Sequence, residues 1–168
     1  MLMLLCAASC KKENINEDQL PPATQTGANT FGCLINGKVY IPKGYSGTGE
    51  QNYKGIYEIF NGRPYLKLTT TQYINNDFQG EIYFSIDSFL TAGIYPLRRN
   101  KNRMVYGGKF FNGCGISGFD TSTYQFGQYN ITKHDVISGI FAGTFSCKIK
   151  PANCDTITIT EGRFDIKL

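Results

Sequence analysis

Six cysteines and a single histidine, His134, are the side chains in this sequence best suited to covalent or metal chemistry. Four of the cysteines form an even set beyond residue 30: Cys33, Cys114, Cys147 and Cys154. Such a set predicts disulfides in an oxidising compartment, and four cysteines allow three pairings. No Cys-x-x-Cys or mixed Cys/His spacing predicts zinc, and no phosphate loop, dinucleotide glycine pattern or calcium loop predicts a cofactor.

One pair of cysteines is favoured by its spacing. Cys147 and Cys154 flank a short segment between two predicted strands, so they are most easily brought within the Cα separation of about 5.5 Å that a disulfide needs. The alternative is that all four cysteines are small buried apolar side chains.

Cys10 has a different setting. An apolar run from Met1 to Ala8 ends in small residues directly before Cys10, an order that resembles a bacterial lipoprotein signal. We expect residues 1–9 to be a signal peptide and Cys10 to be lipidated. Ala7 stands where leucine is usual and no basic residue precedes the run, which predicts a longer signal than the one printed. The alternative is a short buried apolar segment, since eight residues cannot span a bilayer core that needs about 20.

Residues 10–30 are polar and contain few large aliphatic side chains. Such a composition cannot bury enough apolar surface to offset chain entropy, and it predicts a flexible tether stiffened at Pro21 and Pro22. The expected partner is the lipid bilayer, reached through acylated Cys10, and the expected location is the outer membrane of the cell envelope. Residues 31–168 have the size of one domain.

The formal net charge is +4, and the only dense basic cluster is Arg98 to Arg103. It lies between two predicted strands, so a solvated loop is the first interpretation. Contact with an anionic glycan or lipid head group is the second. A nucleic-acid partner is not expected of an exported protein.

Period-two alternation predicts strands throughout the domain. Val136 to Lys150 reads as one strand with an apolar face that includes Ile137 and Phe141. Three Asn-Gly pairs predict tight hairpin turns: Asn36-Gly37, Asn61-Gly62 and Asn112-Gly113.

The last run changes parity, since Ile157 and Ile159 alternate in one register and Phe164 and Ile166 in the other. A bulge at Glu161-Gly162 would restore one inward face. About nine short strands predict an all-β, antiparallel sandwich, with a closed barrel as the alternative. Glycine-rich stretches at 43–49 and 113–118, expected to be crossover loops, favour the sandwich.

Catalytic signals are weak. His134 is expected in an exposed turn, and no Gly-x-Ser-x-Gly elbow accompanies it for a catalytic triad. Paired carboxylates could still hydrolyse a glycoside, and the candidates are Asp77, Glu81, Asp87, Asp120, Glu161 and Asp165. Tyr45, flanked by glycines in a predicted loop, is the candidate ligand contact.

Two stretches carry a family resemblance: Thr26 to Gly44 and Ile137 to Phe145, the latter followed by Asp155 to Asp165. They are similar to uncharacterised lipoproteins from Bacteroidetes. The resemblance implies a Gram-negative envelope and an all-β domain, and it implies no activity. The leading hypothesis is a non-enzymatic structural or binding lipoprotein. The alternatives are a glycan- or small-ligand-binding accessory protein and, third, a carboxylate glycosidase.

Overall fold

The computed structural model describes residues 19–44, 49, 51–98, 102–109, 114–115, 124–151 and 153–168. These segments contain ten β-strands. In chain order the strands are β1 (Thr30–Ile35), β2 (Lys38–Tyr40), β3 (Tyr53–Phe60), β4 (Arg63–Ile74), β5 (Asp77–Asp87), β6 (Gly93–Pro96), β7 (Arg103–Gly107), β8 (Tyr124–Asp135), β9 (Ile140–Lys150) and β10 (Ile157–Lys167). No helix able to cross a lipid bilayer occurs in these segments.

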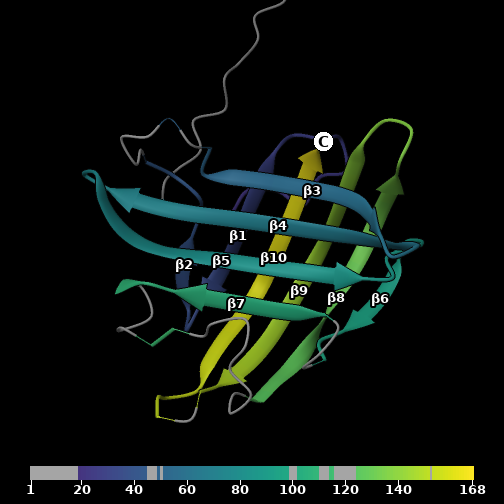
Figure 1. The fold of residues 1–168 in the computed structure, drawn as a ribbon. Helices are drawn as coiled ribbons and strands as arrows, with labels where there is room; N and C mark the ends of the chain where they lie inside the picture. The colour runs from purple at the N-terminus through teal and green to yellow at the C-terminus, as the bar shows by residue number, and fades with distance from the viewer. Residues whose placement is uncertain are drawn as a thin grey trace, which may run out of the picture.

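The strands form two antiparallel sheets packed face to face, which confirms the predicted sandwich. The six-stranded sheet has the order β2-β1-β10-β9-β8-β6, and the four-stranded sheet has the order β3-β4-β5-β7. In Figure 1 the four-stranded sheet lies in front and its strands run across those of the six-stranded sheet. Within the described residues each sheet keeps two open edges, so neither closes into a barrel.

Turn chemistry sets most of the hairpins. Asn36-Gly37 and Asn61-Gly62 connect paired strands with positive φ at both residues, as predicted. A third turn of this kind, Asn75-Asn76 with φ of 53° and 64°, joins β4 to β5. Asn112-Gly113 lies outside the described residues.

The predicted strand from Val136 to Lys150 is wrong at its start. A turn at 136–139 separates β8 from β9, and Ile137 in that turn is fully exposed. The alternation of apolar residues continues through Ile137 by coincidence, because the period-two pattern carries no information about where a strand ends. From Phe141 onward the predicted inward face is correct.

The predicted bulge on β10 is confirmed. The register between β10 and β9 shifts between Ile159 and Gly162, and Glu161 has a φ of 51°. A Cβ on Gly162 would lie 2.5 Å from the Phe145 ring, so only glycine fits here. The extra residue places Phe164 and Ile166 in the core together with Ile157 and Ile159.

Aromatic rings fill the space between the sheets. Phe84 of the four-stranded sheet stacks on Tyr129 of the six-stranded sheet, with ring centroids 4.8 Å apart. Phe31 and Phe145 also contact Phe84 across the interface. This core fixes the two outer faces, on which the accessible polar groups lie.

Candidate functional site

Residues 20–29 lie as a strap against the outer face of the six-stranded sheet. A Cβ on Gly32 of β1 would contact the Pro21 ring at 2.8 Å, so the strap approaches the strand at a position without a side chain. Arg163 of β10 donates a hydrogen bond to the carbonyl oxygen of Pro21 at 3.3 Å. The flexible tether predicted for residues 10–30 therefore does not extend over residues 20–29.

A single carboxylate holds the strap. Asp165 follows the bulge on β10, points away from the core and is 0% exposed. Its Oδ2 accepts hydrogen bonds from the Thr24 hydroxyl at 2.7 Å, from the Thr26 N–H at 2.9 Å and from the Ala28 N–H at 3.2 Å. Its Oδ1 accepts one from the Gly27 N–H at 2.8 Å. We call this arrangement the Asp165 clamp.

The clamp favours the ionised carboxylate. Desolvation by burial would raise the pKa of Asp165, but the bonds from Thr24 and from the strap backbone outweigh it and hold the pKa below its ordinary value. Charge-assisted hydrogen bonds of this kind are stronger than neutral ones. The strap is thus fixed by a buried anion at neutral pH.

A polar groove lies beside the strap on the same outer face. Its larger part, about 370 Å³, extends from Ala23 of the strap across β8, β9 and β10. A second hollow of about 280 Å³ shares Ser146 and continues to Phe126, whose side chain is 67% exposed. The side chains that line the two parts and can form hydrogen bonds are Gln128, Asn130, Thr144, Ser146, Lys148, Thr158, Thr160, Glu161 and Arg163.

This combination suits a neutral, hydroxyl-rich ligand. Amide and hydroxyl groups can donate and accept in fixed directions, and an exposed aromatic ring offers a flat apolar face. Arg163 is already oriented, since it bonds the Glu161 carbonyl at 3.0 Å and pairs with the Glu161 carboxylate at 3.3 Å. The sequence showed these positions only as the polar parity of β-strands, so the groove was missed.

The predicted Cys147–Cys154 disulfide is wrong. Cys154 bonds to Cys114, with a Cα separation of 6.2 Å, and links the segment after β7 to the β9–β10 connection. Cys147 lies within β9, paired opposite Ile159, and its side chain points into the core. It therefore shares an apolar face with Phe145 and cannot reach a loop residue.

Cys33 and Cys147 are buried free thiols. Burial raises the pKa of Cys147 to about 12 and raises that of Cys33 further. Because the thiolate is the reactive form, both side chains act as small apolar groups. The alternative interpretation, that the cysteines are small buried apolar side chains, is therefore correct for Cys33 and Cys147.

His134 is not in an exposed turn but near the end of β8, half-buried among aromatic rings. Its ring meets Phe89 edge-on at a centroid distance of 4.5 Å and also contacts Tyr57 and Phe141. Burial lowers the pKa of His134, and its Nε2 has no hydrogen-bond partner within the described segments. The neutral imidazole is a packing group here.

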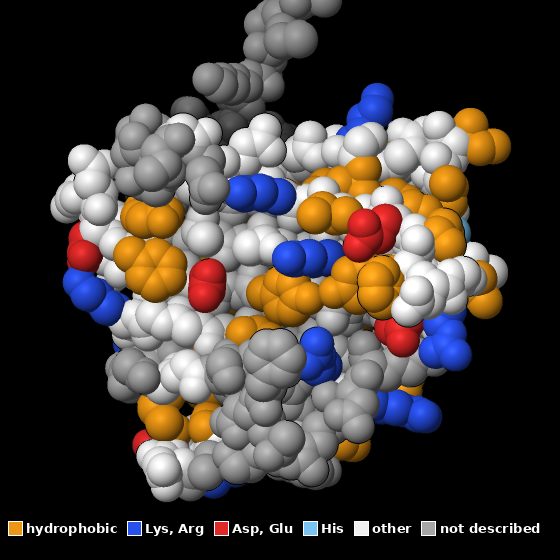
Figure 2. Space-filling model, in the orientation of Figure 1, with side chains coloured by type: hydrophobic (Ala, Val, Ile, Leu, Met, Phe, Trp, Pro, Cys, Tyr) orange, Lys and Arg blue, Asp and Glu red, His pale blue; other side chains and the backbone are white. Residues whose placement is uncertain are grey.

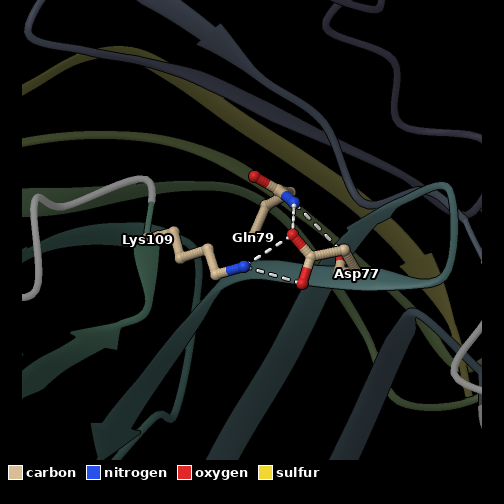
Figure 3. A network of polar contacts seen from close by, with 3 residues as sticks. All are labelled: Asp77, Gln79 and Lys109. Carbon is tan, nitrogen blue, oxygen red and sulfur yellow. Dashed lines mark hydrogen bonds and ion pairs between the residues drawn. The ribbon is translucent and has the colours of Figure 1, made fainter.

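A small polar network occupies one end of the four-stranded sheet (Figure 3). Lys109 Nζ contacts both carboxylate oxygens of Asp77, at 2.7 and 2.6 Å, and Gln79 donates to Asp77 at 2.9 Å. The hydrogen bond from Lys109 lowers the pKa of Asp77. Both charged side chains are more than half exposed, so the network is a solvated surface contact.

Of the predicted basic cluster, Arg98 is exposed, as in a solvated loop, and residues 99–101 lie outside the described residues. The uncharged Asn102 within it is structural: it is 3% exposed, donates to the Pro96 carbonyl oxygen at 2.9 Å and accepts from the Asp87 N–H at 3.1 Å. It therefore joins the ends of β5 and β6.

Three sequence-predicted site residues lie outside the described residues. They are Cys10, the expected lipidation site, Tyr45, the expected ligand contact, and Asp120, one of the candidate carboxylates. Among the described residues no cluster of His, Cys, Asp and Glu could hold a metal ion.

Comparisons of the chain with protein-family models, with curated proteins and with solved structures find no match.

Proposed function

We propose that the protein is a lipid-anchored lipoprotein of the bacterial cell envelope that presents a non-enzymatic β-sandwich as a structural or binding module. The observation that carries the proposal is the Asp165 clamp. It fixes residues 24–28, which follow Cys10 in the chain, to the sandwich, as a mechanical attachment between anchor and domain requires.

The length of chain between anchor and clamp supports this arrangement. Leu20 lies ten residue steps after Cys10, and a fully extended chain of that length spans at most about 35 Å. An acylated Cys10 would keep the domain within that distance of the membrane. Two or more acyl chains would hold it there, since one chain alone binds a bilayer only marginally.

The positions of the carboxylates support a non-enzymatic role. Five of the six candidates belong to the described residues: Asp77, Glu81 and Asp87 lie on β5, whereas Glu161 and Asp165 lie on β10 in the other sheet. Asp120 lies outside them. Two residues that are four positions apart on one strand are separated by about 13 Å along the backbone. This exceeds the roughly 5 to 9.5 Å between the two carboxyl groups of a glycosidase. Asp165 is also committed to the strap.

Metabolic labelling tests the anchor. Cells expressing the full chain and grown with an alkyne fatty acid should incorporate label into the wild type, and Cys10→Ala should lose it. Cys6→Ala is the matched control, because Cys6 belongs to the part expected to be removed. Labelling of Cys10→Ala equal to that of the wild type would disprove the anchor.

A second candidate function, glycan binding, is favoured by the groove beside the strap. Phe126 offers a stacking surface, and Gln128, Asn130 and Ser146 offer hydrogen bonds to hydroxyl groups.

Glycan-array binding by the purified protein tests this candidate. Any hit should be lost in Phe126→Ala and kept in Phe60→Ala, a control that removes an equally exposed ring, 65% against 67%, from the other sheet. Tyr45→Ala tests the loop residue that the sequence singled out. Loss of binding in Tyr45→Ala alone would assign the ligand to that loop instead of the groove.

A further inference from the structure

β3 ends the four-stranded sheet, and among the described residues no strand pairs with its outer edge. The two-residue turn at Asn61-Gly62 makes Phe60 and Arg63 a hydrogen-bonded pair, and bonding alternates from there along the β3–β4 ladder. Every second residue of β3 therefore directs its N–H and C=O away from β4. These residues are Tyr53, Gly55, Tyr57 and Ile59.

The side chains along this edge are more apolar than an isolated edge requires. Ile56 is 49% exposed, Ile59 63% and Phe60 65%. Figure 2 shows hydrophobic side chains gathered over the second half of β3 on this face of the molecule. Long edge strands of this kind are templates for pairing with another chain.

Two exposed charges bracket the apolar centre of the strand. Lys54 and Glu58 lie two residues before and two residues after Ile56, and all three share the outer face of the sheet. An antiparallel copy of the same strand, related by a two-fold axis at Ile56, would place Lys54 opposite Glu58 twice. The edge is thus charge-complementary to itself.

We propose that two copies of the protein associate through β3, paired antiparallel about Ile56 to form one continuous eight-stranded sheet. In this register Gly55 pairs with Tyr57 and Tyr53 with Ile59, so the edge donors and acceptors of both copies meet. Lys54 and Glu58 occupy non-hydrogen-bonded positions, where cross-strand side chains approach most closely, about 4.5 Å between Cα atoms. Closed two-fold association of one self-complementary patch is the commonest form of homodimer.

The neighbouring registers are less favourable. An axis at Gly55 or at Tyr57 would keep the hydrogen-bond alternation but would place Lys54 or Glu58 opposite Ile56. In these registers Lys54 and Glu58 of the two copies would no longer lie opposite each other. The charges therefore select the axis at Ile56.

The structure also leaves room for the inward side chains of a second copy. A hollow of about 520 Å³ lies beside the first half of β3, between Tyr53 and Gly55 on one side and Ile166 of β10 and Leu168 on the other. The side chains of Ile166 and Leu168 occupy the space next to Gly55. Ile59 of the second copy would enter the hollow opposite Tyr53. In the dimer, Ile59 of one copy, which is 63% exposed in the single chain, would thus face the hollow of the other copy.

Cysteine cross-linking of the full-length chain tests the register. Ile56→Cys places two thiols across the two-fold axis, so mild oxidation should give a covalent dimer on a non-reducing gel. Thr69→Cys, on β4 and on the same outer face, is the matched control and should remain monomeric, because two further strand spacings separate its thiols.

Charge exchange tests the pairing independently. Lys54→Glu and Glu58→Lys each create two like-charged pairs and should weaken association about tenfold, measured by sedimentation equilibrium of the purified full-length chain. The double variant restores opposite charges and should restore the wild-type constant. Equal thermal unfolding of all variants confirms that folding is intact. A monomeric wild type, equal cross-linking of both cysteine variants, or no restoration in the double variant would overturn the proposal.

Discussion

Asp165 on β10 and Asp77 on β5 are two carboxylates with lowered pKa values, one buried and the other about half exposed. Asp165 is 0% exposed and accepts its bonds from a segment almost 140 residues away in the chain. The Asp77 side chain is 54% exposed and accepts its bonds from Lys109 and Gln79 at the end of its own sheet. A pKa shift of the same sign therefore accompanies a structural attachment in one place and a solvated contact in the other.

Removing the disulfide should have the largest effect on the free energy of unfolding, and it gives a scale for the effects of Asp165 and Asp77. Cys114 and Cys154 close a loop with a sequence separation of 40, for which the chain-entropy relation gives about 4 kcal/mol. Replacing both by serine should lower the free energy of unfolding by about that amount in urea titrations. A loss of less than about 1 kcal/mol would show that the ends of this loop are already restrained in the unfolded chain.

Asp165→Asn should have the next largest effect. The amide keeps the shape of the carboxylate but turns an NH₂ group toward strap donors, leaving buried N–H groups unsatisfied. We expect a loss of about 3 kcal/mol, with faster hydrogen exchange at residues 26–28. If stability falls without faster exchange in the strap, Asp165 stabilises the sheet and not the strap.

The pH dependence of that difference follows from the lowered pKa of Asp165. A carboxylate whose pKa is lowered by folding contributes stability above its unfolded value, near 3.9, and loses it as the pH falls through the folded value. The gap between wild type and Asp165→Asn should be constant from about pH 5 to 7 and close below about pH 4. A constant gap down to pH 2.5 would contradict an ionised clamp.

Asp77→Asn should have the smallest effect. Water replaces the lost contacts of an exposed ion pair, so the urea midpoint should equal that of the wild type within error. Added salt should leave both proteins equally stable. A loss as large as that of Asp165→Asn would remove the distinction between the two carboxylates.

Turns and bulges could be predicted from the sequence, because their backbone conformation depends on one or two neighbouring residues. Asn36-Gly37, Asn61-Gly62 and the bulge at Glu161-Gly162 carry their own backbone requirements, so their positions could be predicted without tertiary information. The sandwich follows from such turns and from alternation along the strands.

Contacts between distant segments could not be predicted. The partner of Cys154 depends on the path of the chain after β7, and the covering of Asp165 depends on where the strap crosses the sheet. The polar composition of residues 20–29 predicted a flexible segment. Composition could not show that these residues are held by Asp165, a single side chain on a distant strand. His134 was misplaced for a similar reason, since its ring packs against Tyr57 of β3, Phe89 in the segment after β5, and Phe141 of β9.

The bulge on β10 makes the length of this strand as important as its composition. If β10 ran at its present length without the bulge, Asp165 would share the alternation of Ile157 and Ile159 and face the core, while Phe164 and Ile166 would face solvent. Deleting Glu161 would remove the extra residue, so the strand would become regular with Phe164 and Ile166 still in the core and Asp165 still beneath the strap. Related proteins that are one residue shorter at this position should therefore keep the strap without the bulge.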